Sequence, residues 1–374
     1  MTTDSAVHLA HQWWVSRRGG ERLFEELAAL FPEAGISTLF LRRETLTPAM
    51  AGRQWQVSPL GRMAPRFIDH RKLLPLYPWA VRRLRVPAGT RLLLTSDAAL
   101  IKGLRKPPGC VHVCYCHSPA RYLWDMADDY AARTSGIGGP GRWLFRRLLP
   151  RLQRFDREAA AQVDHFIANS RFVAERIRRL YGREAAVIHP PVDIARFAGP
   201  ETAPGDFYLV VSELVSYKRV DLAVTACART GRKLIVAGDG PERRKLEALA
   251  GPAVSFVGRV DDAEIVRLMR GCRAFLHPQI EDFGIAAVEA QAAGRPVIAF
   301  GGGGALETVR DGETGLFFEA QTPESLAAAL ERFERAAGRF TPEVCRNQAQ
   351  RFDAERFRTE IGRQLRAWAV WPNA

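Results

Sequence analysis

Residues 274–300 read AFLHPQIEDFGIAAVEAQAAGRPVIAF. The apolar run Ala274–His277 predicts a buried strand, and the helical pattern that follows it stops at Gly294. The run Pro296–Phe300 then predicts a second buried strand. The stretch is therefore a strand–helix–strand unit, which is the building block of a parallel sheet covered by helices.

Similar apolar runs recur along the rest of the chain, and amphipathic helical patterns separate them. The further runs predicted as buried strands are Leu92–Thr95, Val111–Tyr115, His165–Ala168, Ala186–His189, Tyr208–Val211, Lys233–Ala237 and Val254–Val257. The helical patterns cover Glu21–Leu30, Trp143–Ala161, Ala174–Leu180, Glu242–Leu249 and Ala354–Val370. Strands that alternate with helices predict an α/β fold with parallel sheets, and near-continuous apolar strands fit sheets covered on both faces.

Prolines interrupt this alternation in the segment His189–Asp193, which reads HPPVD. Proline continues neither a helix nor a central strand, so the segment predicts a linker. We therefore expect two Rossmann-like domains that face a cleft, residues 1–195 and residues 196–353, with a hinge within 190–205. Residues 354–374 are expected to form a C-terminal helix that could cross back to the first domain.

The overall composition is that of a globular protein, with 374 residues of which 47% are hydrophobic and 25% are charged. This balance excludes a disordered chain, a fibrous repeat and a small disulfide-stapled domain. Six cysteines in a chain of this length are typical of a reduced, cytosolic protein. The apolar stretches are shorter than the ~20 residues of a membrane-spanning helix, and the first ten residues do not have the pattern of a signal peptide.

The net charge of +13 lies in the first half of the chain. Residues 1–195 contain 30 Lys+Arg against 17 Asp+Glu, whereas residues 196–374 contain 24 of each kind. A positive field of this kind attracts anions, which include nucleic acid, an anionic membrane leaflet and a phosphorylated substrate. The choice among these partners depends on motifs, and we find no helix-turn-helix, zinc-finger or RNP-like motif that favours nucleic acid.

Two glutamates flank the turn between the first strand and the helix of the opening stretch. Glu281 lies in the loop, and Glu289 lies about one and a half turns inside the helix. The start of the helix offers backbone N–H groups and the positive end of the helix dipole, which suit a phosphate. A carboxylate on each side can accept hydrogen bonds from sugar hydroxyls. The alternative is an ordinary strand–helix turn with two solvated glutamates.

Other segments accompany this pair in order: Val211–Leu222, Ala237–Pro241, Phe256–Gly258, Gly294–Ile298 and Gly303–Val309 in the second half, and Gly19–Arg22, Tyr115–Asp125 and Ile188–Asp193 in the first. In this order and spacing, almost the whole chain resembles the retaining glycosyltransferase family 4, which has the two-domain GT-B fold and an E-x7-E signature. Within that family it is most similar to bacterial mannosyltransferases of O-antigen and exopolysaccharide assembly.

The resemblance implies roles for the residues of the E-x7-E segment. Glu281 would contact hydroxyls of the transferred sugar, and Glu289 would accept hydrogen bonds from the nucleotide ribose. Backbone amides around Phe283, Gly284 and Ile285 would contact the sugar and the diphosphate of the donor.

The resemblance also implies a set of cations at the diphosphate, and here the chain departs from the family. Lys218 would neutralise the leaving diphosphate. The family usually has an arginine where this chain has Glu213. Because a glutamate cannot bind phosphate, we expect Glu213 to orient Lys218 and the neighbouring Arg219 to supply the second positive charge.

In the first domain, the resemblance points to His117 and to a pair of glycines. His117 would face the donor sugar, and it follows the predicted strand Val111–Tyr115, at the edge where ligands bind in open α/β sheets. The alternative is a structural histidine. Gly19 and Gly20 would let the backbone approach the diphosphate.

The implied reaction transfers a hexose from a nucleotide sugar with retention of configuration and without a metal. The expected donor is GDP-mannose, and the acceptor is a lipid-diphosphate-linked or growing glycan. None of the 17 aspartates forms the D-x-D pattern that holds a divalent cation in one-domain transferases. The alternatives are a UDP-sugar donor, a catalytically silent subunit of a glycan-assembly complex and, more remotely, a nucleic-acid-binding protein.

Three other patterns are open to more than one interpretation. Cys110, His112, Cys114 and Cys116 are of metal-ligand type, but they alternate along one face of a strand and would converge on one metal ion only if the strand were distorted. The loop Gly301–Gly304 is either a phosphate-approaching loop or a flexible turn.

The basic and aromatic segment Arg71–Arg85 and the eleven arginines within 142–183 suit an anionic membrane surface. The alternative for Arg71–Arg85 is a packed helix kinked at Pro78. We expect a peripheral protein on the cytoplasmic face of a bacterial membrane.

Overall fold

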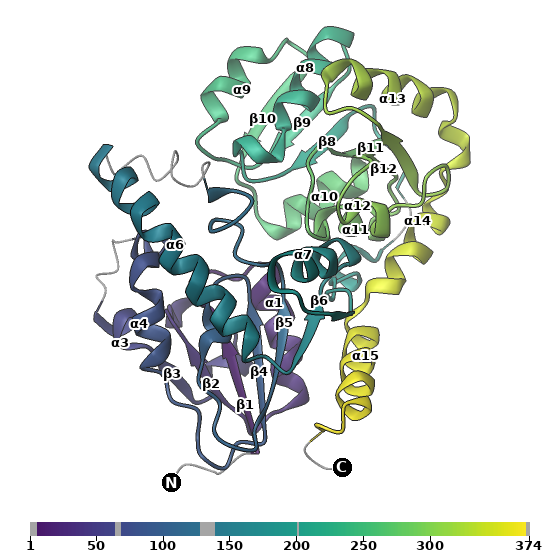
Figure 1. The fold of residues 1–374 in the computed structure, drawn as a ribbon. Coiled ribbons are helices and arrows are strands. Elements are labelled where there is room, and N and C mark those ends of the chain that lie inside the picture. The colour runs from purple at the N-terminus through teal and green to yellow at the C-terminus, as the bar shows by residue number, and fades with distance from the viewer. Residues whose placement is uncertain (1–5, 64–68, 128–138, 200–201, 372–374) are drawn as a thin grey trace. The chain divides into compact units, whose positions relative to one another are not determined.

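The computed structural model describes residues 6–63, 69–127, 139–199 and 202–371. Contacts divide the chain into unit 1, which comprises the residues up to His189 and those from Arg358 onward, and unit 2, Pro190–Phe357. Each unit is an α/β domain built on one parallel sheet, which confirms the expected fold class (Figure 1). The division falls before the boundary expected at residue 195, because Val192 and Phe197 pack in a core of unit 2.

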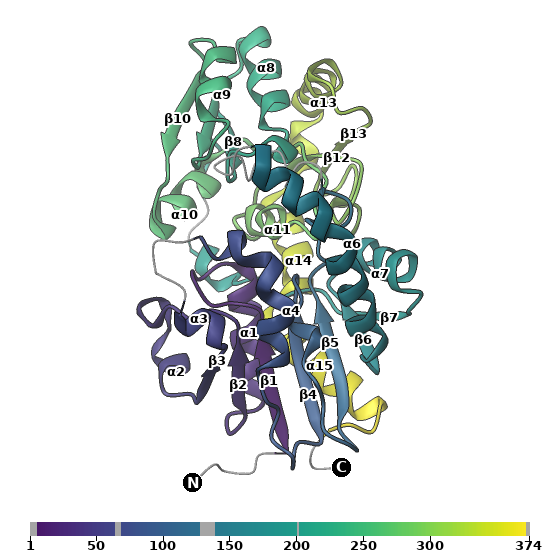
Figure 2. The same cartoon turned by 60° about the vertical axis from the view of Figure 1, so that its left-hand side comes forward.

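The sheet of unit 1 has seven parallel strands in the order β3-β2-β1-β4-β5-β6-β7, which can be followed in Figure 2. Its strands are β1 Val7–His11, β2 Gly35–Thr38, β3 Trp55–Val57, β4 Leu92–Asp97, β5 Val111–Cys116, β6 His165–Ala168 and β7 Ala185–Val187. The chain runs outward from β1 to β3 and then returns to the other side of β1 with β4. Loops that leave neighbouring strands in opposite directions create a crevice at this switch point, where open α/β sheets bind ligands.

The helices of unit 1 are α1 Gly19–Leu30, α2 Pro48–Ala51, α3 Pro59–Met63, α4 Tyr77–Arg82, α6 Gly139–Ala161 and α7 Arg171–Tyr181. The C-terminal helix α15 spans Ala354–Ala367, so it begins in unit 2 and continues in unit 1. The Arg358 guanidinium forms an ion pair with Glu26 of α1. The indole of Trp368, just after α15, stacks on His165 of β6 with ring centroids 4.3 Å apart.

Unit 2 has six parallel strands in the order β10-β9-β8-β11-β12-β13, with a switch point between β8 and β11. The strands are β8 Tyr208–Val211, β9 Leu234–Ala237, β10 Val254–Gly258, β11 Ala274–His277, β12 Val297–Phe300 and β13 Gly315–Phe318. The helices are α8 Val220–Thr230, α9 Arg243–Leu249, α10 Asp262–Gly271, α11 Ile285–Ala292, α12 Ala305–Thr308, α13 Pro323–Arg335 and α14 Pro342–Ala349.

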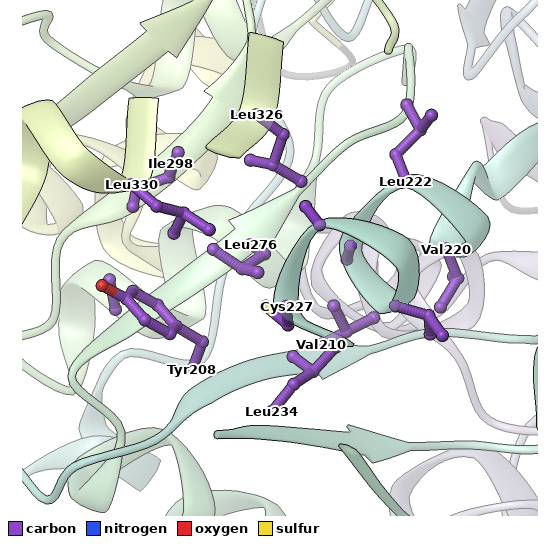
Figure 3. Packing of buried hydrophobic residues seen from close by; sticks show 14 of the residues in the cluster. Tyr208, Val210, Val220, Leu222, Cys227, Leu234, Leu276, Ile298, Leu326 and Leu330 are labelled. Carbon is purple, nitrogen blue, oxygen red and sulfur yellow. The ribbon is translucent and has the colours of Figure 1, made fainter. Parts of the chain in front are cut away.

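The core of unit 2 explains why its short apolar runs form a sheet. Figure 3 shows one cluster, in which side chains of β8, β9, β11 and β12 pack against α8 and α13. The labelled residues are Tyr208, Val210, Val220, Leu222, Cys227, Leu234, Leu276, Ile298, Leu326 and Leu330. Because helices cover both faces of a parallel sheet, its strands are apolar along their whole length.

The structure differs from the sequence expectations in several strands and at Pro78. Strands β1, β2, β3 and β13 were not expected; β3 and β13 are short edge strands, and β1 contains two histidines that are buried. Pro78 does not kink a helix, because it lies in the first turn of α4, where a missing backbone N–H costs no helical hydrogen bond. A turn of 3-10 helix, His70–Leu76, precedes α4. Among the described residues, no helix has both the length and the apolar character needed to cross a bilayer.

Candidate functional site

Polar residues lie at the switch point of the sheet in each unit. In unit 2, Lys218 follows β8 and Glu281 follows β11, and these two strands are neighbours. In unit 1, His11 ends β1, Ser96 lies near the end of β4, and the two residues are register partners. Each unit therefore carries its own cluster of polar side chains at the carboxyl edge of its sheet, and each cluster is called here the half-site of that unit.

The half-site of unit 2 is organised around an ion pair. The Lys218 ammonium donates to Oε1 of Glu281, and Nε2 of Gln279 donates to the same oxygen at 2.9 Å. Burial by itself would raise the pKa of the Glu281 carboxyl, but the charge of Lys218 and the surrounding hydrogen bonds lower it to about 2. Glu281 is therefore an ionised carboxylate at neutral pH, and Lys218 is its counter-ion.

The same Gln279 amide reaches a buried histidine at the end of β11. Its Nε2 lies 3.2 Å from Nδ1 of His277, whose side chain is almost fully buried. Burial lowers the pKa of His277 to about 4, so the ring is neutral. A Cβ atom at Gly284 would lie 3.2 Å from Nε2 of His277, and Gly284 has a φ of 93°. Both the space and the backbone conformation therefore require glycine at this position.

Helix α11 begins directly after this glycine. The first amides of a helix have no intrahelical acceptor, so those of Ile285 and Ala286 can bind an anion. The Phe283 ring points into the core, where it packs edge-on against Phe352 at 5.3 Å. Phe283 thus anchors the loop, and only its backbone is available for the predicted contact with the donor.

The glycine loop after β12 holds the Glu281 loop in place. The Gly304 amide donates to the Glu281 carbonyl at 2.8 Å. A Cβ atom at Gly303 would lie 2.5 Å from that carbonyl oxygen, and one at Gly304 would lie 2.4 Å from Cα of Phe283. These glycines allow two backbones to pack closely, which is a role that the sequence did not indicate.

The predicted ribose acceptor, Glu289, lies on α11 beside an arginine. Arg196, in the 3-10 turn Ala195–Phe197, has its guanidinium 3.9 Å from Oε1 of Glu289 and 3.2 Å from Oδ2 of Asp262. The Glu289 side chain is 15% exposed, so its carboxylate remains accessible to a ligand.

Arg219, the residue predicted to supply the second positive charge at the diphosphate, already has several hydrogen-bond partners. Arg219 caps the N-terminus of α8 with a left-handed backbone (φ 47°). Its guanidinium donates to Asp221 at 3.2 and 3.3 Å and to the carbonyl of Gln321 at 3.3 Å. The Lys218 ammonium donates to the carboxylate of Glu281. The roles predicted for Arg219 and Glu213 remain predictions.

The half-site of unit 1 is a chain of three buried polar groups that ends at the half-buried His117. Nε2 of His117 lies 2.7 Å from Oγ of Ser96, which lies 3.0 Å from Nδ1 of His11. Nε2 of His11 lies 3.9 Å from Oε1 of Glu21. At Gly20, a Cβ atom would meet the rings of His11 and His117 at 3.9 Å, which is ordinary van der Waals contact. His117 therefore lies beside a small open space at the start of α1.

A cavity of about 550 Å³ opens near the start of α1. Its lining residues, all in unit 1, include three arginines, two carboxylates and Trp13: Gln12, Trp13, Val15, Ser16, Arg18, Gly20, Glu21, Arg42, Asp69, His70 and Arg71. The mixture of charged and aromatic groups suits a ligand that carries both phosphate and apolar or sugar surface.

Sequence reasoning missed four polar residues that support the predicted ones. These residues are His11, Ser96, His277 and Gln279. The positions of three of these residues could have indicated a functional role. His11, Ser96 and His277 each lie in the last two residues of a strand next to a switch point, where open α/β sheets bind ligands. His11 was also hidden because β1 itself was not predicted.

Two protein-family models match the chain in succession. Residues 17–196 match the model described as Glycosyltransferase Family 4, and residues 193–352 match the model described as Glycosyl transferases group 1. The first match falls largely on unit 1 and the second falls within unit 2.

Individual relatives cover less of the chain. A glycogen synthase of Mycobacterium tuberculosis is 32% identical over 228 residues, which are 56% of this chain and 54% of that protein. A GDP-mannose-dependent alpha-mannosyltransferase of Corynebacterium glutamicum is 32% identical over 123 residues, which are 32% of this chain and 30% of the relative. The chain thus spans at most about half the length of these curated relatives.

The fold comparison covers nearly the entire chain. The crystal structure of Anabaena HepE in complex with UDP aligns with a TM-score of 0.70 and 18% identity, over 96% of this chain and 99% of that one. HepE has also been solved with UDP-glucose. Identity at this level shows a shared fold. The two parallel-sheet units therefore have the fold of the GT-B glycosyltransferases, and in this chain a region that matches the Glycosyltransferase Family 4 model precedes a region that matches the Glycosyl transferases group 1 model.

Proposed function

We propose that the chain is a retaining, metal-independent glycosyltransferase that transfers mannose from GDP-mannose to a lipid-linked or growing polysaccharide. The observation that carries the proposal is the half-site of unit 2, where an ammonium, a carboxylate and a helix N-terminus meet at one switch point. These groups match the parts of a nucleotide sugar, because the diphosphate is anionic and the sugar offers hydroxyl donors.

The cleavage of the sugar–phosphate bond places negative charge on the leaving diphosphate. Lys218 and the first amides of α11 are positioned groups that would stabilise this charge. Lys218 forms an ion pair with Glu281, so a diphosphate would compete with this carboxylate for the ammonium. Release of Lys218 would free the Glu281 carboxylate to accept hydrogen bonds from sugar hydroxyls. We propose that this exchange couples recognition of the diphosphate to recognition of the sugar.

The proposed donor rests on the sequence resemblance and on the mannosyltransferase relative, which is named as GDP-mannose-dependent. The alternative donor is a UDP-sugar, because HepE was solved with UDP-glucose. A titration calorimetry experiment with GDP, UDP and ADP in EDTA separates these two donors. Selective binding of GDP supports the proposal, preference for UDP overturns the donor, and a need for added Mg²⁺ or Mn²⁺ contradicts the metal-free mechanism.

We propose that unit 1 binds the acceptor and an anionic membrane surface. In support, Met63, Leu76, Trp79, Trp143 and Leu144 are exposed large apolar side chains of unit 1. A groove of about 300 Å³ is lined by three arginines and one glutamate, Arg82, Arg151, Arg154 and Glu158, together with apolar residues of α6, of α4 and of the turn before α4. Basic and aromatic groups together are typical of a protein that lies on a bilayer.

A vesicle co-sedimentation experiment tests this surface. The protein should bind vesicles that contain phosphatidylglycerol at low salt, and binding should weaken at high salt because exposed charges are screened beyond about 10 Å at 0.1 M salt. Binding that is equal for neutral and anionic vesicles would contradict the electrostatic part of the proposal.

A further inference from the structure

The chain of polar groups Glu21, His11, Ser96 and His117, called here the His117 relay, has a direction that the structure determines. A serine hydroxyl has a single hydrogen. Because Oγ of Ser96 lies 2.7 Å from His117 and 3.0 Å from His11, it donates to one ring and accepts from the other. Two arrangements of hydrogens are therefore open for the neutral rings.

The carboxylate of Glu21 decides between these arrangements. Nε2 of His11 lies 3.9 Å from Oε1 of Glu21, and Oε2 accepts a hydrogen bond from the Arg18 amide at 2.9 Å. If Nε2 of His11 carries the hydrogen, an N–H dipole faces the carboxylate. If it does not, a lone pair faces the carboxylate in a buried site, which is electrostatically unfavourable. His11 therefore carries its hydrogen on Nε2 and leaves Nδ1 as an acceptor.

The remaining hydrogens follow from this choice. The Ser96 hydroxyl donates to Nδ1 of His11, so its oxygen accepts from Nε2 of His117. The ring of His11 is held by stacking on Phe24 at 4.8 Å between centroids. Nδ1 of His117 is then an unprotonated acceptor, and it has no hydrogen-bond partner within the part of the chain that the structure describes.

Burial keeps the His117 ring in its neutral form. It lowers the pKa of His117 to about 4, so the ring carries one hydrogen at neutral pH. Burial would raise the pKa of Glu21, but its contacts with His11 and the Arg18 amide lower it overall, so the carboxylate is ionised. These directions agree with the geometric argument.

We propose that Glu21, His11 and Ser96 are positioning residues that fix His117 in the Nε2–H tautomer, so that its Nδ1 accepts a hydrogen bond from a hydroxyl of the transferred sugar. This inference rests on the proposed function for the identity of the ligand, whereas the tautomer itself belongs to the free protein. It selects for a ligand group that donates a hydrogen bond, and it excludes a phosphate oxygen as the partner of His117.

The tautomer can be measured directly by ¹⁵N NMR of the full chain with labelled histidine. Spectra at pH 8, where a histidine of ordinary pKa is neutral, should show His117 with a protonated Nε2 and an unprotonated Nδ1. The His117→Gln variant assigns the signals. Ser96→Ala should mix the two tautomers of His117, and Ser96→Thr should restore the single form. A wild-type His117 that is protonated on Nδ1 would overturn the inference.

A matched control is available in the same sheet. His8 and Ser37 form another buried histidine–serine hydrogen bond, at 2.8 Å, that is not part of the His117 relay. Ser37→Ala should therefore leave the tautomer of His117 unchanged. A shift of the His117 signals as large as that caused by Ser96→Ala would mean that general loosening of the sheet, and not the relay, controls the tautomer.

An activity measurement links the tautomer to sugar binding. In a transfer assay, Ser96→Ala should lower kcat/KM by about fivefold, the scale of one hydrogen bond, and Ser96→Thr should recover it. If the wild-type protein transfers no sugar, the proposed function fails while the NMR result still stands. If it transfers sugar and Ser96→Ala is as active as the wild type, the role of the relay fails while the proposed function stands.

Discussion

Both half-sites lie at the switch point of a parallel sheet, but they differ in charge. The half-site of unit 2 is an ion pair, whereas that of unit 1 is mainly a chain of histidine rings and a hydroxyl. In unit 2, the residues after β8 and β11 form a charged pair, Lys218 and Glu281. In unit 1, His11 and Ser96 near the ends of β1 and β4, together with His117 after β5, form a chain of two rings and a hydroxyl that ends at the carboxylate of Glu21. A parallel sheet thus provides the location, and the side chains at its carboxyl edge decide whether that location stabilises charge or orients neutral groups.

The two half-sites should therefore respond to different changes in their side chains. A charged pair loses its function when either charge is removed, because the remaining charge is left uncompensated. A neutral chain loses its order when a ring becomes charged or a hydrogen-bonding atom is deleted. The following experiments act on one half-site and leave the other as the internal reference.

The largest effect is expected for Lys218→Ala. If the ammonium stabilises the leaving diphosphate, its loss should cost about 2–4 kcal/mol of transition-state stabilisation, which lowers kcat by roughly 30- to 10³-fold. Steady-state transfer kinetics measure this loss. Lys245→Ala is the matched control, because Lys245 is an exposed lysine of unit 2 that pairs with Glu242. Full turnover by Lys218→Ala would remove Lys218 from the mechanism.

A smaller effect is expected from acid, and it should fall mainly on unit 1. Burial lowers the pKa of His8 and His117 to about 4 and that of His112 to about 3, whereas unit 2 contains one histidine, His277. A histidine whose pKa is lower in the folded state binds protons more readily when unfolded. Its contribution to stability is complete above pH 6.5 and decreases as the pH falls towards 4.

Between pH 7 and pH 5.5, unit 1 should therefore lose about 1 kcal/mol for each buried histidine. All eight tryptophans lie in unit 1, so urea unfolding followed by tryptophan fluorescence reports on that unit. Hydrogen exchange of β8 and β9, corrected for the intrinsic effect of pH, reports on unit 2. Glu281 stays ionised throughout, because its pKa is about 2. An equal loss in both units would contradict the assignment of acid sensitivity to unit 1.

The smallest effect is expected for Glu289→Gln. A charged hydrogen bond to the ribose would become a neutral one, and we expect GDP affinity to weaken by about 1 kcal/mol, or roughly fivefold. Calorimetry measures this change. Glu264→Gln on α10 is the control, because Glu264 pairs with Arg267 on the surface. Unchanged affinity in Glu289→Gln would place the nucleotide elsewhere.

The part of the fold that the sequence predicted well is the part where apolar periodicity is strong. The strands β6, β8 and β11 begin and end at the predicted residues, and β5 was predicted one residue short. Strand β1 was missed because His8 and His11 interrupt its apolar pattern. Both histidines are nevertheless buried, since Ser37 and Ser96 satisfy their ring nitrogens. A polar residue that finds a distant partner cannot be recognised from its neighbours in the sequence.

The same limit applies to the site. The sequence placed Lys218 and Glu281 at one site, but each was assigned a separate ligand, whereas the structure joins them as an ion pair across 63 residues of chain. Gly303 and Gly304 were predicted as a separate loop. In the structure, the backbone of the Glu281 loop occupies the positions where a Cβ atom of either residue would lie. These contacts depend on the packing of β11 beside β12 and have no local signal.

The path of α15 has a consequence for the synthesis of the chain. Ile361 and Leu365 are fully buried, and Trp368 and Trp371 pack on His165 and Phe31 of unit 1. A ribosome completes the first 189 residues early, yet the segment that covers them emerges only after all of unit 2. At roughly 5–20 residues per second, this interval lasts on the order of ten seconds, during which nascent unit 1 exposes apolar surface. Unit 2, although made second, is thus the first to possess all of its own sequence.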